Sequence, residues 1–436
     1  MPASAPIDTA SHPAAAAEPL LALRQRHAQI CAEGLQINMT RGVPATEQLD
    51  LAQAFLALPG ADDWRARDGS DARNYGGLQG LPEARELLAG PMLGLPAEQV
   101  AIGENSSLAL MHEALGYAML HGAPASTQPW AREAQVKFIC PVPGYDRHFS
   151  LCEAFGIEML PVPLLADGPD MDAVEALVAS DPTIKGMWCV PKYSNPSGII
   201  YSEQVVRRLA RMPSAAQDFT LFWDNAYAVH HLSSARPANQ DIAGLSMAAG
   251  HGQRVLMFAS TSKVLFPGAG LALFGGSPAT LAWWLRHRAV RTIGPDKLNQ
   301  LRHVRFFAEC GGLERHMQAQ QQVLAPKFAC VDRVFREHFA AAPNGRATAR
   351  WSQPQGGYFV SLEVARGCAR RTVELAREAG VALTPAGAPF PYGRDPGDSL
   401  IRISPTCVGL ADLAKACAVV AACAQLAAEE ARAAQA

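Results

Sequence analysis

The sequence predicts an α/β protein with a three-layer α/β/α large domain, built on a mainly parallel sheet, and a smaller α+β domain from the C-terminal third and the N-terminal segment. Through the middle of the chain, short and wholly apolar runs alternate with helical segments, which is typical of strands buried on both faces of a sheet. After about residue 305, long helical stretches replace this alternation. A chain of 436 residues also has the length of two or three domains.

The expected elements follow in chain order. Helical spacing is found at residues 20–31 and 82–89, a short strand is expected at 100–102, and a helix opens at Ser106 and runs to about Leu120. Later β-prone runs are residues 136–140, 186–190, 221–223, 255–259 and 271–274, and most are separated by helical segments such as 172–179 and 202–211. The last third predicts an alternating segment at 357–362, a helix at 372–379, a strand at 400–404 and an Ala-rich helix at 410–434.

These patterns divide the chain into four parts. We expect a disordered tail (1–18), an N-terminal segment of the small domain (19–70), a large domain (71–305) and a small C-terminal domain (306–436).

Composition excludes several classes of function. The 38 Lys and Arg residues balance 40 Asp and Glu residues, so a general binder of nucleic acid or anionic membranes is not expected. We find no run of about 18 uninterrupted apolar residues, and the N-terminus lacks the basic and apolar regions of a signal peptide. The 10 cysteines form no Cys-x-x-Cys pair, which is typical of buried thiols in a cytoplasmic protein without structural zinc.

Ligands in open α/β sheets bind beyond the carboxyl ends of the strands, so the residues after each apolar run are candidates for a site. Lys263 follows one run, beside Ser260, Ser262 and a glycine-rich turn. A partly desolvated lysine there has a lowered pKa and can form a Schiff base, although it can also be an ordinary surface cation. Asp224 ends another apolar run and is followed by Tyr227. A carboxylate so placed is functional, paired or the N-cap of a helix.

Three further places carry polar groups. Asn195 offers an amide in an Asn-Pro-x-Gly turn, which is also a common turn by itself. At Asn105, Ser106 and Ser107 a strand gives way to a helix, whose N–H groups and hydroxyls suit a phosphate or a simple helix cap. Arg402 lies in an apolar strand, where a carboxylate is its natural bidentate partner. The chain therefore combines an amine, an acid, a phenol, an amide, a phosphate seat and a carboxylate-binding arginine.

This combination resembles the fold-type I aminotransferases of class I, which depend on pyridoxal 5'-phosphate, and especially the class If aspartate aminotransferases. The resemblance runs from about Gly34 to the C-terminal helix. Its most specific stretches are residues 38–42 (Asn-Met-Thr-Arg-Gly), 143–149 (Pro-Gly-Tyr-Asp-Arg-His-Phe) and 293–303 (Ile-Gly-Pro-Asp-Lys-Leu-Asn-Gln-Leu-Arg-His). The resemblance implies that residues 71–305 bind the cofactor.

The resemblance implies a role for each polar group near the cofactor. Lys263 would bind the cofactor covalently and then move the Cα proton of the substrate. Asp224 would keep the ring nitrogen protonated, and Tyr227 and Asn195 would donate hydrogen bonds to the ring 3-oxygen. Tyr145 would stack on the face of the ring.

Further members of the implied site surround this group. His148 would orient the aspartate, although a structural core histidine is an alternative. The phosphate would lie at the start of the expected helix, against Asn105, Ser106, Ser107, Ser260 and Ser262. Tyr75 would reach the phosphate from the neighbouring subunit, which implies a homodimer with shared active sites.

The substrate would be held by cations. Arg402 would clamp its α-carboxylate, with Asn195 nearby and Gly42 contributing a backbone N–H. Arg41, Lys297 and Arg302 are candidates for the second cation that an acidic substrate needs, although each can equally be a surface or helix-terminal charge.

One position departs from the family pattern. Many members carry an arginine just beyond the Schiff-base lysine, where it neutralises the phosphate, but Gly270 occupies that position here. Lys192 or a residue of the other subunit is a candidate for the missing charge.

The implied activity is transamination between a small amino acid and a 2-oxo acid, with aspartate and 2-oxoglutarate as the expected pair. Different or broad specificity, and β-lyase or decarboxylase chemistry on the same fold, stay open. A ligand-sensing regulator is disfavoured because only about 30 residues precede the matched segment, too few for a helix-turn-helix domain. A nicotinamide-binding enzyme is disfavoured because Gly268-Ala269-Gly270 lacks the third glycine of the dinucleotide motif.

Overall fold

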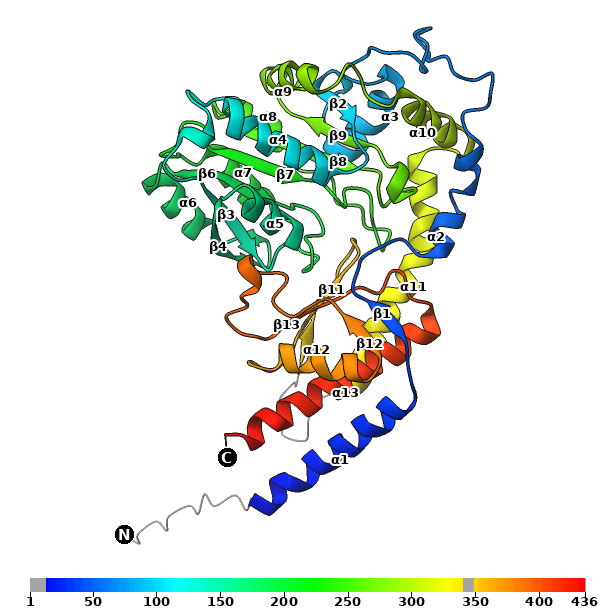
Figure 1. The fold of residues 1–436 in the computed structure, drawn as a ribbon, viewed down its shortest axis with the longest axis vertical. Helices are drawn as coiled ribbons and strands as arrows, with labels where there is room; N and C mark the ends of the chain where they lie inside the picture. The colour runs from blue at the N-terminus through cyan, green and yellow to red at the C-terminus, as the bar shows by residue number, and fades with distance from the viewer. Residues whose placement is uncertain (1–12, 340–348, 436) are drawn as a thin grey trace.

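The computed structural model describes residues 13–339 and 349–435. Its centre is an eight-stranded sheet in the order β2-β9-β8-β7-β6-β3-β4-β5 (Figure 1). Neighbours from β8 to β4 are parallel, whereas β9 lies antiparallel to both β2 and β8, and β5 is antiparallel to β4. The predicted, mainly parallel sheet is therefore confirmed. Its strands are β2 (Val100–Gly103), β3 (Lys137–Val142), β4 (Glu158–Leu165), β5 (Gly168–Pro169), β6 (Ile184–Cys189), β7 (Thr220–Asp224), β8 (Val255–Ser260) and β9 (Ala272–Gly275).

Strand β4 was not expected from the sequence. Pro161 and Pro163 interrupt its apolar pattern, and proline cannot donate to a sheet ladder. β4 tolerates both because beyond it only the two-residue β5 continues the sheet.

Apolar side chains alternate between the two faces of the sheet. Leu221 and Trp223 of β7 belong to one core, and Phe222 belongs to the other. Both faces are covered by helices, so the predicted three-layer arrangement is confirmed. One core includes side chains from α3 (Pro82–Leu93), α6 (Met171–Ser180), α7 (Glu203–Arg211), α8 (Ile242–Ala248) and α10 (Lys297–Glu309), and the other from α4 (Ser107–His121), α5 (Asp146–Ala154) and α9 (Pro278–Arg291).

A second, smaller unit joins the two ends of the chain (Figure 1). Strand β1 pairs in parallel with β12, and Ile37 and Met39 of β1 are buried in the same core as α13. The predicted contribution of the N-terminal segment to the α+β unit is thus confirmed. Its elements are α1 (Pro13–Ala32), β1 (Ile37–Met39), α2 (Thr46–Asp50), α11 (Leu313–Phe339), β10 (Arg350–Trp351), β11 (Val360–Glu363), α12 (Ala369–Glu378), β12 (Val381–Leu383), β13 (Leu400–Ile403) and α13 (Leu410–Ala433).

Helix α11 connects the two units. Leu313 and Met317 at its start lie in the core of the large sheet, whereas Phe328 and Phe335 lie in the core of the smaller unit. The division of the chain at residue 305 stays a prediction, and the packing favours a boundary within α11. Helix α1 begins at Pro13, so it overlaps the tail expected at 1–18; residues 1–12 lie outside the described residues.

Helix α13 is apolar because it packs inside the protein. Within the described part of the chain it is the one helix long and apolar enough to cross a membrane, and 61% of its most apolar window is buried inside the protein. It packs against α1, α11 and α12. Its composition is that of a core helix.

Candidate active site

The candidate residues gather at one edge of the large sheet. The carboxyl ends of β3, β6, β7 and β8 meet there because these strands are parallel. β2 runs in the same direction as β8, since both lie antiparallel to β9, and Gly103 of β2 and Ser260 of β8 both pair with Ala272. The segments that follow five strands are therefore brought together.

Asp224, at the end of β7, is fully enclosed. Its Oδ2 lies 3.1 Å from Nε2 of His148, and both side chains are 2% exposed. The imidazole stacks on Trp188 of β6, with ring centroids 4.3 Å apart, and meets Tyr145 edge to face at 5.0 Å. Among the described residues, Oδ1 of Asp224 has no hydrogen-bond partner. One carboxylate oxygen is thus fixed and the other is free to meet a cationic group.

Lys263 lies after the carboxyl end of β8, next to this acid. Its ammonium nitrogen is 5.2 Å from the ring centroid of Tyr227. Burial lowers the pKa of Lys263, and the nearby Asp224 opposes that shift. Burial also raises the pKa of the Tyr227 hydroxyl well above its usual value, with Tyr145 and Asp224 adding to the shift. Burial therefore shifts the two pKa values in opposite directions, down for the amine and up for the phenol.

A polar cradle is formed between β2 and β8. The hydroxyl of Ser262 donates to the carbonyl of Asn105 at 2.7 Å and lies 3.0 Å from the hydroxyl of Ser260. Ser106 is the N-cap of α4, where its hydroxyl accepts from the N–H of Ala109, and Ser107 begins the helix. The positive end of the α4 dipole points into this cradle.

Gly270 closes the cradle from the side. A Cβ at this position would lie 2.5 Å from the carbonyl oxygen of Asn105 and 3.0 Å from the hydroxyl oxygen of Ser262. The backbone therefore approaches too closely for any side chain. A side chain at position 270 would require Asn105 or Ser262 to move.

Lys192, one of the two candidates for the charge of that arginine, lies elsewhere. Its ammonium group donates to the carbonyl of Ala228 at 2.7 Å and to Asn239 at 3.2 Å. A different cation lies beneath the turn before the cradle: Arg288 is 1% exposed, and a Cβ on Gly103 would fall 1.7 Å from its Nη2. Arg288 was not singled out from the sequence, because it lies in helix α9, just outside the stretch 293–303.

Arg402, on β13 of the smaller unit, reaches the same edge. Its Nη1 donates to Asp146 at 2.8 Å and to the side-chain oxygen of Asn195 at 3.4 Å. Its guanidinium carbon is 5.0 Å from the ring centroid of Phe359, and a Cβ on Gly42 would meet the same ring at 2.4 Å. Arg402, Asn195 and Gly42 are thus brought together, and Gly42 must be a glycine for Phe359 to fit.

The candidate distal cations are placed differently from one another. Arg41 is exposed and follows Thr40, whose carbonyl accepts from Thr384, the residue that contacts Nε of Arg402. Lys297 is 6% exposed and donates to the carbonyls of Asp71 and Tyr75. Lys297 therefore fastens the loop that carries Tyr75, and within the described chain no hydrogen bond links it to Arg402.

Arg302 lines the same hollow as Asn105 and Gly270, whereas Tyr75 lies at the surface. Arg302 donates to the carbonyl of Leu58 and lies over the ring of Phe55. Tyr75 is 79% exposed, so in this chain it completes no site.

Sequence reasoning did not single out several residues of the site. Asp146 lies within the stretch 143–149, so the signal was present, but Trp188, Phe359 and Tyr358 occur in apolar runs that give no functional signal. His230 is 3% exposed beside Lys263, and both of its ring nitrogens lack partners among the described residues. Burial and the nearby Lys263 lower the pKa of His230 to about 3, so it is neutral.

This chain is similar to known proteins both in sequence and in structure. The family model for aspartate amino-transferase matches residues 11–436. An aspartate aminotransferase of Corynebacterium glutamicum is 46% identical over 408 residues, which are 94% of this chain and 93% of the relative. The crystal structure of an aspartate transaminase from Corynebacterium glutamicum has a TM-score of 0.91 at 44% identity, covering 95% of this chain and 97% of that one.

A more distant structure shares the fold. An alpha-aminoadipate aminotransferase of Thermus thermophilus, complexed with N-(5'-phosphopyridoxyl)-L-leucine, has a TM-score of 0.72 at 21% identity and covers 93% of this chain and 95% of that one. The sheet, its two helical layers and the buried lysine and acid at its edge define an aminotransferase of fold type I. The chain belongs to the aspartate aminotransferase family.

Proposed function

We propose that this aminotransferase binds pyridoxal 5'-phosphate at the edge of its large sheet and transfers the amino group of aspartate to 2-oxoglutarate. The observation that carries the proposal is that a desolvated amine, Lys263, lies near a buried acid, Asp224. Oδ1 of Asp224 has no partner among the described residues. The aspartate substrate is supported by the name of the 46% identical relative.

Three features fit the cofactor. The free oxygen of Asp224 can accept from a protonated pyridine nitrogen, and His148 holds the carboxylate in place. The cradle of Ser106, Ser260 and Ser262 suits a phosphate at the start of α4. When bound, the cofactor supplies a ring that accepts the electrons released at the substrate Cα.

The residues of the chain then have separate tasks. The lowered pKa of Lys263 leaves a neutral fraction of its amine, which can take the Cα proton and return it. Tyr227 and Asn195 would hold the ring 3-oxygen of the bound cofactor, and Tyr145 would pack against the ring. Arg402 binds the α-carboxylate through the N–H groups that Asp146 and Asn195 leave free. Arg41, close to this arginine through Thr384, is the best-placed candidate for the distal carboxylate.

The cofactor is tested by absorption. Purified protein should bind pyridoxal phosphate with a visible band, and Lys263→Ala should abolish or shift that band. Lys327→Ala is a matched control, because Lys327 is also buried and also has a lowered pKa but lies in the smaller unit. A protein that stays colourless with added cofactor would contradict the proposal.

The substrate needs a separate measurement. A screen of single amino acids against the cofactor-loaded enzyme should give the fastest half-reaction with aspartate, and Arg41→Ala should slow aspartate more than alanine. Equal rates for aspartate, alanine and phenylalanine would reject the acidic substrate and leave transamination standing. No particular feature of the site favours lyase or decarboxylase chemistry.

We also propose a homodimer with shared sites, acting in the cytoplasm. Tyr75 is 79% exposed, Val290 in the last turn of α9 is 90% exposed, and Ile293 just after that helix is 66% exposed. Gly294 lies against the backbone of Gly76, so the loops of Ile293 and Tyr75 adjoin. All ten cysteines are free thiols, which fits a reducing compartment.

Mixing two inactive variants tests the shared site. When equal amounts of Lys263→Ala and Tyr75→Ala chains exchange subunits, half of the dimers are mixed. One of the two sites in each mixed dimer has both native residues, so about a quarter of wild-type activity should return. No recovery after exchange of subunits would reject the shared site.

A further inference from the structure

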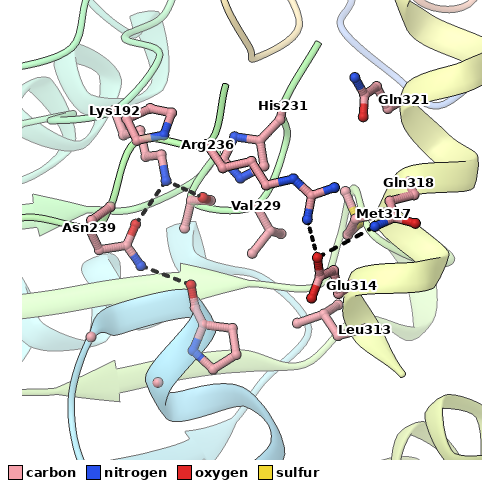
Figure 2. A pocket seen from close by; sticks show the side chains of 16 residues that line it. Lys192, Val229, His231, Arg236, Asn239, Leu313, Glu314, Met317, Gln318 and Gln321 are labelled. Carbon is pink, nitrogen blue, oxygen red and sulfur yellow. Dashed lines mark hydrogen bonds and ion pairs between the residues drawn. The ribbon is translucent and has the colours of Figure 1, made fainter. Parts of the chain in front are cut away.

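A second cavity lies behind the active-site loops and has no part in the chemistry described so far. It has a volume of about 400 Å³ and lies between the end of α3, the loop after β7 and the first turns of α11 (Figure 2). This is within the size range of small-molecule sites, about 300–1,000 Å³. None of the residues of the phosphate cradle lines it.

Lys192 is the buried charged group of this cavity, which the exposed Arg236 and Glu314 also line. Its side chain lies in the wall, and the residue is 5% exposed. Burial lowers its pKa to about 8, so it remains largely protonated at neutral pH. Within the described chain no carboxylate forms an ion pair with it, and its two partners are the carbonyl of Ala228 and the side-chain oxygen of Asn239. An ammonium group has three N–H donors, so one is left for a ligand.

The other residues that line the cavity limit the charge and polarity of a ligand. Val229, Leu313 and Met317 present apolar surface beside the lysine (Figure 2). His231 adds no charge, because burial, Lys192 and Arg236 lower its pKa to about 4. Arg236 is paired with Glu314, whose side chain is 73% exposed. A buried cation without a counter-ion favours an anion, while the apolar lining and Glu314 disfavour a second carboxylate.

The cavity is also connected to the catalytic loops. Lys192 lies three residues before Asn195, and Ala228, which accepts its hydrogen bond, directly follows Tyr227. The hydroxyl of Tyr193 bonds Nδ1 of His231 at 2.7 Å across the same two loops. A ligand that binds the ammonium group of Lys192 therefore acts on the loops that position Asn195 and Tyr227.

From this geometry we propose that the cavity is a regulatory site for a small organic monocarboxylate with an apolar body. The carboxylate pairs with Nζ of Lys192, and the body packs on Val229, Leu313 and Met317. Binding itself follows from the cavity alone, whereas the effect on rate rests on the proposed function.

The probe for this site is 3-phenylpropionate, titrated calorimetrically into the holoenzyme in saturating succinate, a dicarboxylate that occupies the substrate site. We expect one probe per chain. The neutral 3-phenylpropionamide should bind roughly tenfold more weakly, since it cannot pair with the ammonium group. Lys192→Met should weaken the probe by a similar factor, and Lys415→Met, an exposed lysine on α13, should not.

A second variant guards against misfolding of Lys192→Met. Ala238 is an exposed residue of the cavity lining, so Ala238→Trp fills the cavity without changing the core. It should abolish probe binding and leave the absorption band of the holoenzyme unchanged. Binding that succinate abolishes, or that both variants retain, would overturn the proposed site.

The regulatory effect is measured as rate. In wild-type enzyme the saturating probe should change kcat by about twofold or more, and in Ala238→Trp it should change nothing. Binding with an unchanged kcat in both proteins would overturn the regulatory role. An enzyme that binds the probe but has no transaminase activity would instead reject the proposed function.

Discussion

Gly270 shows how one residue without a side chain shapes the cradle. The positions of Asn105 and Ser262 leave no room for a Cβ there. The hydrogen bond between these two residues therefore depends on a glycine ten residues after Ser260. An arginine at position 270 would need this turn to be arranged differently.

Replacing Gly270 tests this close packing. Gly270→Ala should push Ser262 away from Asn105 and weaken binding of pyridoxal phosphate by about tenfold or more, because overpacking costs about 1–3 kcal/mol. Titration of the apoenzyme, followed by absorption, measures the effect. Gly268→Ala is the control, since nothing lies within 4 Å of a Cβ there. Equal affinities for the two variants would contradict the steric explanation.

Asp146 gives a second prediction. Its carboxylate pairs with Nη1 of Arg402 and is 30% exposed. It therefore opposes a substrate carboxylate at the same guanidinium. Asp146→Asn should lower KM for the amino acid by roughly two- to fivefold, which is the scale of a partly exposed ion pair. Steady-state kinetics with both substrates measures it, and a raised KM would show that Asp146 mainly positions Arg402.

At the scale of elements, the site depends on where helices begin. Ser106 caps α4 at the cradle, and Asp170 caps α6 on the outer layer by accepting from the N–H groups of Asp172 and Ala173. Both caps satisfy backbone groups that the helix itself leaves unpaired. Only the cap of α4 lies beside the cofactor site.

Removing the N-cap of α6, Asp170, should change stability but not activity. Asp170→Ala should lower the free energy of unfolding by about 1 kcal/mol and leave kcat unchanged, because α6 does not contact the site. Asp170→Ser should retain most of that stability, since serine also accepts at an N-cap. Urea unfolding of both variants measures the difference, and equal losses would show that the cap bond is not the cause.

At the scale of the whole molecule, burial keeps several imidazoles neutral. Burial lowers the pKa of His303 to about 4 from 6.5, and His230, His231 and His316 are shifted in the same direction. The folded protein then binds fewer protons than the unfolded chain below about pH 6.5. The free energy of unfolding should therefore fall as the pH drops from 6.5 towards 4.

A substitution at His303 measures how much one buried imidazole contributes to this pH dependence of stability. It is fully buried, and its ring nitrogens lie near Thr261 and the carbonyl of Asn299. His303→Gln should be less stable at neutral pH, but near pH 5 its free energy of unfolding should change less steeply, by about 1 kcal/mol per pH unit. Urea unfolding at a series of pH values measures the slope. Parallel curves for the two proteins would contradict the shifted pKa.

The sequence by itself determined most strands of the large sheet and several residues of the candidate site. Apolar runs and strand ends predicted the strands, and Lys263, Asp224 and Asn195 were identified because the carboxyl ends of parallel strands share one edge. β4 was missed because its prolines break the apolar pattern, and Lys192 was one of two candidates for the phosphate charge, the other being a residue of the neighbouring subunit.

Tertiary structure decided the partners of these residues. Asp146 and Phe359 meet Arg402 across more than 40 residues of chain, Lys297 fastens the loop of Tyr75, and Lys192 faces a separate cavity. The physical reason is that local propensity depends on near neighbours along the chain, whereas desolvation, ion pairing and close backbone approach depend on which distant segments the two cores bring into contact.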